Sequence, residues 1–483
     1  MDRRTIAIVG AGFTGALLTL HLLKRCSDQD RILLIEKSPR LGAGLAYSTG
    51  NPNHLLNVRA GNMSAFSAEP DHFVHWLRNL APPLRDQLAE PPEPTGFVPR
   101  GLFGAYVQQC LADAVWHGER GDRLTIVSDA VTAIERNPDG LTDGLTDGLT
   151  LGLAMGRTLT ADTAVLAIGN FPPDRSHGPV FGDPWDERAI ADLDREAAII
   201  ILGTGLTMVD TVISLLDRGH RGPIQAVSRR GLLPRQHVGA IPDDTGEIRL
   251  PRAWTFDPSP SGESLVRLTH EVRRIIDRAE RLGRGWRSVI DGLRPHTQRL
   301  WQELSTEDRR RFLRHLRPWW DVHRHRAAPQ VMARIAEARD RGQLAVTAAR
   351  VLGTHADKRG VTVRLHLRGS GEAKAISGDR LIDCTGLNGD CAKIEQPLLK
   401  QLLADGLVRP DPLKLGLDVA EAGAVVGADG AAAGDLFAVG PITRGALWEI
   451  VAVPDLRVAC EQMAARLLPD RQAERLALRA AGA

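Results

Sequence analysis

Three glycines near the start of the chain have the spacing of a phosphate-binding turn. Gly10, Gly12 and Gly15 fit the pattern G-x-G-x-x-G, and Ala11 lies inside the turn. In such a turn the first glycine permits a sharp bend, the second lets a pyrophosphate approach the backbone, and the third lets helix and strand pack closely. The N-terminus of a following helix offers N–H groups and partial positive charge to the phosphates. This spacing therefore predicts the binding of a dinucleotide.

The elements around these glycines are those that such a turn requires. An apolar, β-rich run precedes Gly10, and a helical pattern of leucines, residues 17–23, follows it. A second apolar run, residues 32–35, ends in Glu36, which lies 21 residues after Gly15. An acidic side chain at that distance is expected to accept hydrogen bonds from a ribose. The alternative is a glycine-bearing strand–helix turn in another kind of α/β protein.

A second glycine turn occurs in the middle of the chain. The segment 197–210, AAIIILGTGLTMVD, repeats the opening pattern, with Gly203 and Gly205 at the first two glycine positions and Thr204 between them. Met208 stands where the third glycine is expected. This departure leaves the phosphate turn intact but bears on how closely the helix and strand can pack.

Two arginines follow the next strand, where the first domain has an acid. Arg229 and Arg230 follow the predicted strand 224–227, separated from it by Ser228. Guanidinium groups at this position suit a 2′-phosphate, so we predict NADPH rather than NADH as the second dinucleotide. The alternative is a solvated basic turn.

The composition is that of a globular protein with several domains. Of the 483 residues, 43% are hydrophobic and 25% are charged, and the net charge of +2 argues against nucleic acid or a membrane as a partner. None of the five cysteines forms C-x-x-C, which argues against a redox disulfide or a zinc knuckle. The N-terminus enters a strand at once, so we expect no signal peptide and a cytoplasmic location. A homo-oligomer remains an open alternative.

The order of the elements predicts an α/β fold with two Rossmann-like dinucleotide-binding domains, the second inserted into the first. We expect a first dinucleotide-binding domain in two parts, residues 1–175 and 381–470, which the resemblance described below identifies as FAD-binding, and an NADPH-binding domain at 190–380. A β-meander is predicted within 123–170, formed by runs 124–127, 131–134, 149–155 and 164–168. The arginine-rich segment 255–342 has helical periodicity and is predicted to be a helical insertion.

Several unusual segments point to a family. The chain contains GAGFTGALLTLHLL, LGAGLAYST, HLLNVRAGNMSAF, RGHRGPIQAVSRRGLLP and LFAVGPITRGALWEIVAVPDLR. In these segments it resembles the bacterial FAD-NAD(P)-binding flavoprotein family that contains the FAD-dependent urate hydroxylase. It is more distantly similar to Baeyer–Villiger and N-hydroxylating monooxygenases.

The resemblance implies roles for matching residues. FAD would be held by the first glycine turn, by Glu36 and Lys37, and by a further set along the chain: Gly42, Gly44, Tyr47, His54, Leu55, Asn57, Met63, Gly440 and Thr443. Many flavoproteins carry an acid after the glycine that corresponds to Gly440, but Pro441 stands here, so Thr443 or backbone amides would supply those contacts. NADPH would be held by Gly203, Thr204, Gly205, Arg229 and Arg230.

The implied activity is that of a monooxygenase. An FAD- and NADPH-dependent enzyme would use O₂ through a flavin C4a-hydroperoxide to convert urate, a small molecule, to 5-hydroxyisourate. The same chemistry on an amine or another heteroaromatic compound is the nearest alternative. A flavin reductase or dehydrogenase that does not use O₂, and a non-catalytic dinucleotide sensor, are the other two classes.

Four residues are predicted to face the substrate or the flavin ring. They are His54, Asn57, Arg444 and Trp448, with Arg444 the cation for an anionic substrate. Each has a structural alternative: a hydrogen-bonded loop histidine, a solvated arginine, or a packing pair formed by Trp448 and Glu449. The stretch 319–325, WWDVHRH, suggests a metal site, but its helical pattern lacks an acid–histidine pair at helical spacing, so no metal is predicted. Trp319 and Trp320 are expected to pack the insertion against the nucleotide domains, and Asp321 and His323 are weaker candidates for the substrate pocket.

Overall fold

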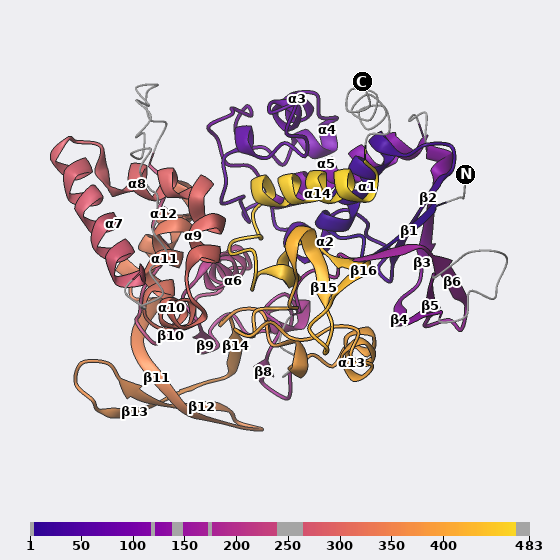
Figure 1. Cartoon of the computed structure of the whole chain (residues 1–483). Coiled ribbons are helices and arrows are strands. Elements are labelled where there is room, and N and C mark those ends of the chain that lie inside the picture. The colour runs from indigo at the N-terminus through magenta and orange to yellow at the C-terminus, as the bar shows by residue number, and fades with distance from the viewer. Residues whose placement is uncertain (1–3, 117–120, 138–147, 172–175, 239–263, 470–483) are drawn as a thin grey trace. The chain divides into compact units, whose positions relative to one another are not determined.

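The computed structural model describes residues 4–116, 121–137, 148–171, 176–238 and 264–469. The chain divides into two compact units, of which the first comprises 1–52, 58–171 and 388–483 and the second 53–57 and 172–387. Each unit contains its own mainly parallel β-sheet with helices packed against it (Figure 1). The predicted α/β fold with two Rossmann-like domains is confirmed.

The first unit is built on a six-stranded sheet in the order β15-β16-β7-β1-β2-β3. All neighbouring strands are parallel except β15 and β16, which are antiparallel. The strands are β1 (Arg4–Val9), β2 (Asp30–Glu36), β3 (Leu124–Ser128), β7 (Thr163–Leu166), β15 (Ala424–Val426) and β16 (Ala432–Ala438). All residues of β7 and four of six in β1 are buried, as expected for parallel strands covered on both faces.

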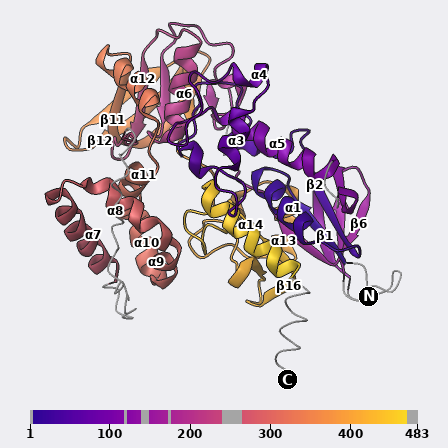
Figure 2. The ribbon, with the colours of Figure 1, turned by 90° about the horizontal axis from the view of Figure 1, so that it is seen from above.

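Helices from distant parts of the sequence pack against one another in this unit. Helix α1 (Phe13–Arg25) contacts both α5 (Arg100–Trp116) and α14 (Val453–Leu467). Figure 2 shows α14, in yellow, beside α1, in indigo. The last segment of the chain therefore completes both the sheet, through β16, and the helical layer of the first unit. The unit's other helices are α2 (Gly44–Tyr47), α3 (His72–Arg78), α4 (Pro82–Arg85) and α13 (Pro397–Ala404).

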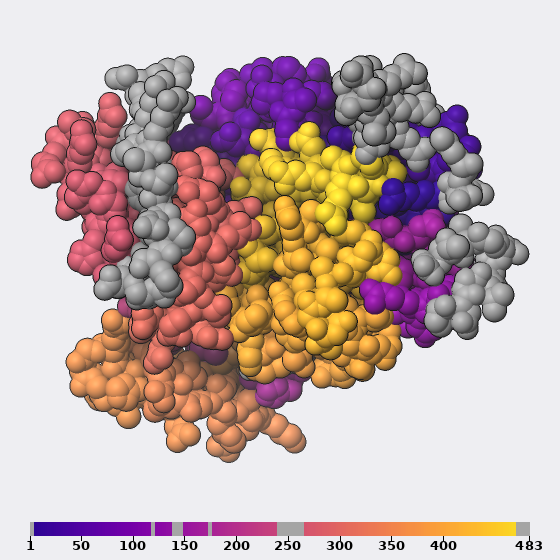
Figure 3. All heavy atoms as spheres, in the orientation of Figure 1, coloured from indigo at the N-terminus to yellow at the C-terminus, as the bar shows by residue number. Residues whose placement is uncertain are grey.

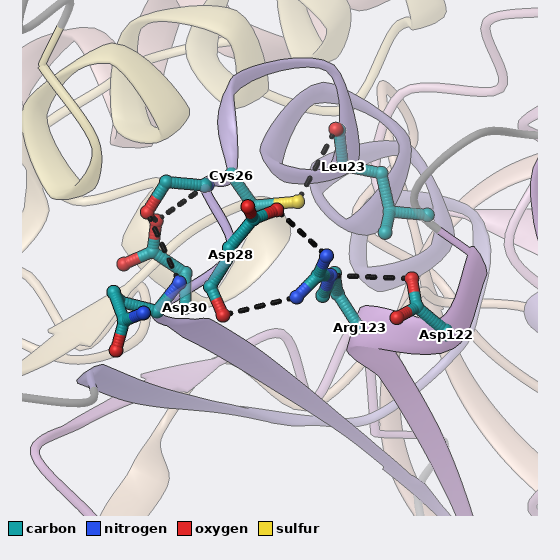
Figure 4. Close-up of polar contacts among 8 residues, drawn as sticks. Leu23, Cys26, Asp28, Asp30, Asp122 and Arg123 are labelled. Carbon is teal, nitrogen blue, oxygen red and sulfur yellow. Dashed lines mark hydrogen bonds and ion pairs between the residues drawn. The ribbon is translucent and has the colours of Figure 1, made fainter.

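A polar turn fixes the connection between α1 and β2 (Figure 4). Asp30 accepts hydrogen bonds from the backbone N–H and the hydroxyl of Ser27, both at 2.7 Å. Arg123, which precedes β3, donates to the carbonyl oxygen of Asp28 at 2.9 Å and to its carboxylate at 2.7 Å. The guanidinium thus joins the edge strand β3 to the turn that feeds β2.

The predicted β-meander is correct only in its middle. Strands β4 (Val131–Arg136), β5 (Leu149–Leu153) and β6 (Thr158–Ala161) form a three-stranded antiparallel sheet. The outer two runs were wrongly included: β3 pairs with β2 and β7 pairs with β1, both parallel, in the main sheet. Four consecutive short apolar runs do not reveal that the first and last pair with strands far away in the sequence.

The second unit has a seven-stranded sheet in the order β13-β12-β11-β10-β9-β14-β8. Strands β11, β10, β9, β14 and β8 are parallel to one another. On the other side of β11, strands β12 and β13 extend the sheet in antiparallel pairing. The bounds are β8 (Val180–Phe181), β9 (Ile199–Leu202), β10 (Ile224–Ser228), β11 (Leu344–Asp357), β12 (Gly360–Leu367), β13 (Ala373–Gly378) and β14 (Arg380–Asp383). Helix α6 (Leu206–Asp217) connects β9 to β10. Strand β13 was not predicted.

The arginine-rich insertion is mainly helical in its described part, and residues 255–263 of the predicted range lie outside that part. Its helices are α7 (Ser264–Arg281), α8 (Gly285–Leu293), α9 (Thr297–Glu303), α10 (Thr306–Arg311) and α11 (Arg317–Arg324). The next helix, α12 (Pro329–Asp340), leads directly into β11, which lies parallel to β10. Helix α12 is therefore the crossover helix of the sheet rather than part of the insertion.

The first prediction concerns Gly15, where α1 approaches the glycine turn. A Cβ atom on Gly15 would lie 1.8 Å from the carbonyl oxygen of Gly10, which is backbone and cannot yield. We expect Gly15→Ala to lower the free energy of unfolding by about 3 kcal/mol or more, the upper range for overpacking. Gly12→Ala is the control, because its Cβ would make only ordinary contacts with the backbone of Gly44, 3.5 Å from the Cα and 4.0 Å from the N. Urea unfolding followed by circular dichroism checks both; equal stability of the two variants contradicts the packing argument.

The second prediction concerns the pH dependence of stability. His21 on α1 is buried, which lowers its pKa from 6.5 to about 4. Between these values the unfolded chain binds a proton that the folded chain does not, so stability falls as the pH drops from 6.5 to 4 and levels off below. The full shift corresponds to about 3 kcal/mol. We expect His21→Gln to reduce this pH dependence in urea unfolding, whereas His75→Gln, at an exposed position on α3, leaves it unchanged.

Candidate functional site

The first glycine turn crosses the carboxyl ends of the parallel strands in the first unit. Gly10 has φ +99°, and a Cβ atom there would lie 2.6 Å from the carbonyl oxygen of Ala167, just after β7. Its N–H donates to the carbonyl of Ile35 in β2 at 2.8 Å. Gly12 then serves as the N-cap of α1 and no side chain caps the helix. The geometry is that of a helix N-terminus presented at the sheet edge where α/β proteins bind phosphates.

A second glycine-bearing loop lies directly against this turn. The N–H of Gly42 donates to the carbonyl of Ala11 at 2.7 Å, and a Cβ atom on Gly44 would lie 3.4 Å from the Cα of Gly12. Gly42 and Gly44 both have positive φ, of +81° and +55°. Two strips of backbone without side chains therefore meet beside the start of α1, which suits close approach by a pyrophosphate.

Glu36 is held in a fixed orientation at the end of β2. One carboxylate oxygen accepts the N–H of Ala11 at 2.7 Å and the other accepts the N–H of Ser38 at 2.9 Å. A carboxylate can accept about four hydrogen bonds, so acceptor capacity remains for the hydroxyls of a ribose. Lys37 is exposed beside it. The spacing seen in the sequence thus corresponds to a direct contact between the acid and the glycine turn.

The turn that follows β16 reaches the same helix. Gly440 has φ +88°, and a Cβ atom on it would lie 2.9 Å from the hydroxyl of Thr14 in α1. Thr443 is fully buried, and both its N–H and its hydroxyl donate to the carbonyl of Gly440, at 2.9 and 2.8 Å. The Thr443 hydroxyl proton is used inside the turn, which leaves backbone amides as the donors that the turn can offer to a ligand.

These segments bring most of the predicted flavin-binding residues together in one unit. Gly10, Gly12, Glu36, Gly42 and Gly440 all lie at the carboxyl-end edge of the first sheet or in loops against it. Backbone cradles that a Cβ would fill, an uncapped helix and an oriented acid fit the phosphates and ribose of FAD. The individual residue assignments remain predictions.

Tyr47 and Met63 lie in the first unit but inside apolar surroundings. The Tyr47 ring packs against Phe103 and Phe13, with ring centroids 4.7 and 5.7 Å apart. Burial raises the pKa of Tyr47 to about 12, so its hydroxyl is protonated at neutral pH. Met63 is 1% exposed. The role of both beside a flavin ring stays a prediction.

Residues 53–57 belong to the second unit, although the segments on either side belong to the first. His54 is 4% exposed, and its Nε2 lies 2.8 Å from the hydroxyl of Ser214 and 3.1 Å from the carbonyl of Asp210 on α6. The carbonyl of Asn57 lies 3.0 Å from Nε2 of His237. His54, Leu55 and Asn57 are thus packed with the second unit, and the hydrogen-bonded alternative accounts for the buried His54 imidazole. Their predicted catalytic and flavin-binding roles stay predictions.

The second glycine turn repeats the geometry of the first. Gly203 has φ +99°, a Cβ on it would lie 2.3 Å from the carbonyl of Cys384, and its N–H donates to Val227 of β10 at 2.8 Å. The Thr204 hydroxyl donates to the carbonyl of Leu232 at 2.6 Å. Met208, at the third glycine position, is fully buried. Here the helix packs through a thioether side chain, while the turn itself is preserved.

The two arginines after β10 differ in their surroundings. Arg230 donates to the carbonyl of His315 at 3.1 Å, and its guanidinium lies 5.8 Å from the ring centroid of Trp319. Arg229 is exposed, and within the described part of the chain no ion pair holds it. Arg229 is therefore the better placed of the two to meet a 2′-phosphate.

The predicted substrate-facing residues near the end of the chain are enclosed in the first unit. Trp448 and Glu449 are about 5% and 6% exposed. Nη2 of Arg444 lies 3.6 Å from the position that a Cβ on Gly389 would occupy, so this guanidinium lies against backbone. Contacts of Arg444 and Trp448 with a substrate stay predictions.

The tryptophan–histidine stretch serves the helical insertion. Trp320 packs on the small core of Ile290, Leu293 and Leu300 within the insertion, which corrects the expectation that it packs against the nucleotide domains. Trp319 is 44% exposed. Asp321 pairs with Arg317 at 3.2 Å, and Nδ1 of His323 lies 2.7 Å from the carbonyl of Trp319.

Among the described residues no three His, Cys, Asp or Glu side chains gather to hold a metal ion. No described helix is both long and apolar enough to cross a bilayer.

Comparison with known proteins supports the dinucleotide-binding assignment. Residues 7–171 match the model of a family described as FAD-NAD(P)-binding. This match covers the glycine turn, Glu36 and the Gly42–Gly44 loop, and it confirms the prediction of FAD and a nicotinamide dinucleotide as cofactors. No curated protein matches the chain in sequence.

Solved structures with the same fold cover nearly the whole chain. Ornithine hydroxylase from Pseudomonas aeruginosa aligns with a TM-score of 0.62 at 16% identity, over 97% of this chain and 100% of that one. L-lysine 6-monooxygenase from Pseudomonas syringae has a TM-score of 0.61 at 14% identity, over 96% and 99%. The FAD-bound cadaverine monooxygenase from Erwinia amylovora has 0.62 at 12% identity, over 98% and 95%. At these identities the likeness shows that the chain shares their fold.

The third prediction separates folding from nucleotide binding in the second unit. A Cβ on Gly205 meets nothing within 4 Å, so Gly205→Ala should fold like the wild type. The added methyl group would stand where the pyrophosphate approaches, and we expect about tenfold weaker NADPH binding. Gly203→Ala is the contrast, because its Cβ would clash with backbone and should destabilise the fold. Melting temperature and NADPH titration measure the two effects; normal NADPH affinity of Gly205→Ala would show that the cofactor does not use this turn.

Proposed function

We propose that the protein is an FAD- and NADPH-dependent monooxygenase that hydroxylates the primary amine of a small molecule with O₂. The observation that carries the proposal is the presence of two glycine turns in one chain, at Gly10–Gly15 and Gly203–Gly205, each at the carboxyl ends of the parallel strands of its own sheet. One dinucleotide site fits the flavin and the other fits the reductant. When bound, FAD and NADPH would supply the redox and oxygen chemistry.

The chain's own residues bind and orient the two cofactors in this proposal. The N-terminus of α1 and the Gly42–Gly44 loop hold the FAD pyrophosphate, while Glu36 accepts hydrogen bonds from its ribose. In the second unit the N-terminus of α6 holds the NADPH pyrophosphate, and Arg229 pairs with the 2′-phosphate. All five cysteines of the chain lie in its described part, where they are buried and form no disulfide.

An amine is preferred to urate as the substrate class. The proteins that align over nearly the whole chain are named for ornithine, lysine and cadaverine, all of which carry a primary amine. Urate is supported by the segments of sequence that resemble the urate hydroxylase family. Both substrates require the same cofactors, so they are separated by measurement of the product.

A single assay tests the function. The purified protein, reconstituted with FAD, is supplied with NADPH and with ornithine, lysine, cadaverine or urate in turn, while NADPH oxidation, peroxide and hydroxylamine are measured. Amine-stimulated NADPH oxidation with hydroxylamine and little peroxide is the expected result. Stimulation by urate alone contradicts the amine proposal, and a protein that oxidises NADPH without oxygenating any of the four compounds acts as a reductase.

The fourth prediction concerns the choice of nicotinamide cofactor. Arg229→Ala removes an exposed cation at the end of β10 and should weaken NADPH binding by about tenfold, with NADH binding unchanged. The control is Arg221→Ala, because Arg221 lies in the same unit but pairs with Glu196 at 2.6 Å. Titration of both nucleotides gives the result; a parallel loss of NADPH and NADH affinity would refute a role for Arg229 in 2′-phosphate recognition.

A further inference from the structure

A buried carboxylate from a distant loop lies on the turn that follows β16. Asp411 is 6% exposed, and a Cβ atom on Gly445 would lie 2.1 Å from its Cγ and 2.3 and 2.5 Å from its two carboxylate oxygens. The carboxylate therefore occupies the space above the backbone of Gly445. The turn itself, residues 440–445, contains no acidic residue.

The loop that carries Asp411 is tightly folded. Residues 409–418 form a hairpin-like loop in which Pro410 and Leu417 pair as an isolated bridge. Within it, Asp411 Oδ1 accepts the N–H of Leu413 at 2.9 Å, and the carbonyl of Asp411 accepts the N–H of Lys414 at 2.8 Å. The side chain and the backbone of Asp411 thus organise the loop together.

The same loop contacts the turn at a second point. The N–H of Leu417 donates to the carbonyl of Ile442 at 2.8 Å, and a Cβ on Gly416 would lie 1.9 Å from that oxygen. Two glycines on opposite sides, Gly416 in the loop and Gly445 in the turn, allow this close approach. Neither position could hold a larger residue without separating the loop from the turn.

Backbone strain is concentrated in the same place. Lys414 has φ +59°, a left-handed backbone conformation that residues with a side chain adopt only under strain. Strained backbone persists where the surroundings over-determine it, and it clusters at ligand-binding sites. Here the strained loop places the Asp411 carboxylate against the turn at Gly445. Burial of a carboxylate is costly without such compensating contacts.

We propose that Asp411 is a positioning residue, whose buried carboxylate holds the Gly440–Gly445 turn in the conformation that binds the flavin end of FAD. The inference rests on the proposed use of FAD and adds a residue to that site. Asp411 acts through the turn, because its carboxylate is enclosed against Gly445. The loop and the turn both lie in the segment 388–469, coloured orange to yellow in Figure 3.

Removal of the charge tests this role. We expect Asp411→Asn to weaken FAD binding by about tenfold, since a buried hydrogen-bonded charge is lost, and to shift the visible absorption bands of the bound flavin. Asp418→Asn is the matched control, because Asp418 lies in the same loop but pairs with Arg409 at 2.7 Å. It should leave FAD affinity within about twofold of the wild type. Unchanged affinity and spectrum in folded Asp411→Asn overturn the proposal, as does a lowered melting temperature with an unchanged spectrum.

A second variant approaches the same contact from the turn. Gly445→Ala places a methyl group on the carboxylate and should weaken FAD binding as Asp411→Asn does, and the double variant should be no weaker than either single variant. Additive losses contradict a shared contact. If Asp411→Asn does not fold, Gly445→Ala decides alone, and normal FAD affinity overturns the proposal.

The wild-type protein separates this inference from the proposed function. If it binds FAD but oxygenates no substrate, the monooxygenase proposal is refuted and the proposed role of Asp411 stands. If it binds no FAD, both proposals are overturned.

Discussion

The sharp glycine turn between the end of a β-strand and the start of a helix is the constraint on which both units depend. In the first unit Gly15 on α1 is so close to Gly10 that no Cβ atom can stand between them. This contact directs the first turn of the helix toward the carboxyl ends of β1, β2 and β7. The positively polarised helix end and the Glu36 carboxylate then lie where a dinucleotide can meet both.

The second unit shows which part of this arrangement is essential. Gly203 keeps the positive φ and the close contact with the neighbouring strand end, whereas the third glycine is replaced by the buried Met208. A long unbranched side chain fills the space between helix and sheet, as methionine does in irregular cores. The sharp turn is therefore preserved in both units, while the distance between helix and strand is free to vary.

What could be read from the sequence is local in character. The two turns, Glu36, α1 and the helical nature of the insertion follow from glycine spacing and from periodicity over a few residues. The errors concern elements whose partners lie far away in the sequence. Strands β3 and β7 pair within the main sheet of the first unit. Helix α12 leads into β11 of the second sheet and is not part of the insertion. No periodicity indicates that residues 53–57 pack with the second unit, or that Asp411 reaches Gly445. These contacts join segments that only the complete fold brings together.

The arginines of the insertion illustrate how pairing limits function. Arg299, Arg317 and Arg326 are held by Glu303, Asp321 and Asp291, and Arg309 donates to three backbone carbonyls. These four arginines are thus held within the insertion, and exposed ion pairs of this kind contribute little individually to stability. An arginine is a stronger candidate for a ligand contact when, like Arg229, it is exposed at a sheet edge that already has a phosphate-binding turn.

Backbone strain in the first unit lies where one segment must contact several distant elements at once. Among the described residues, the three non-glycine residues with positive φ are Lys414, Ala422 and Glu449, and all lie in the segment 388–469 that returns to complete the first sheet. This segment supplies β16, the Gly440 turn and the Asp411 loop, so its backbone must satisfy the sheet, α1 and the turn together. A segment that contacts only residues near it in the sequence can keep negative φ values at its non-glycine residues. The cost is concentrated where a late segment closes around elements formed by the first forty residues, which is where the flavin is proposed to bind.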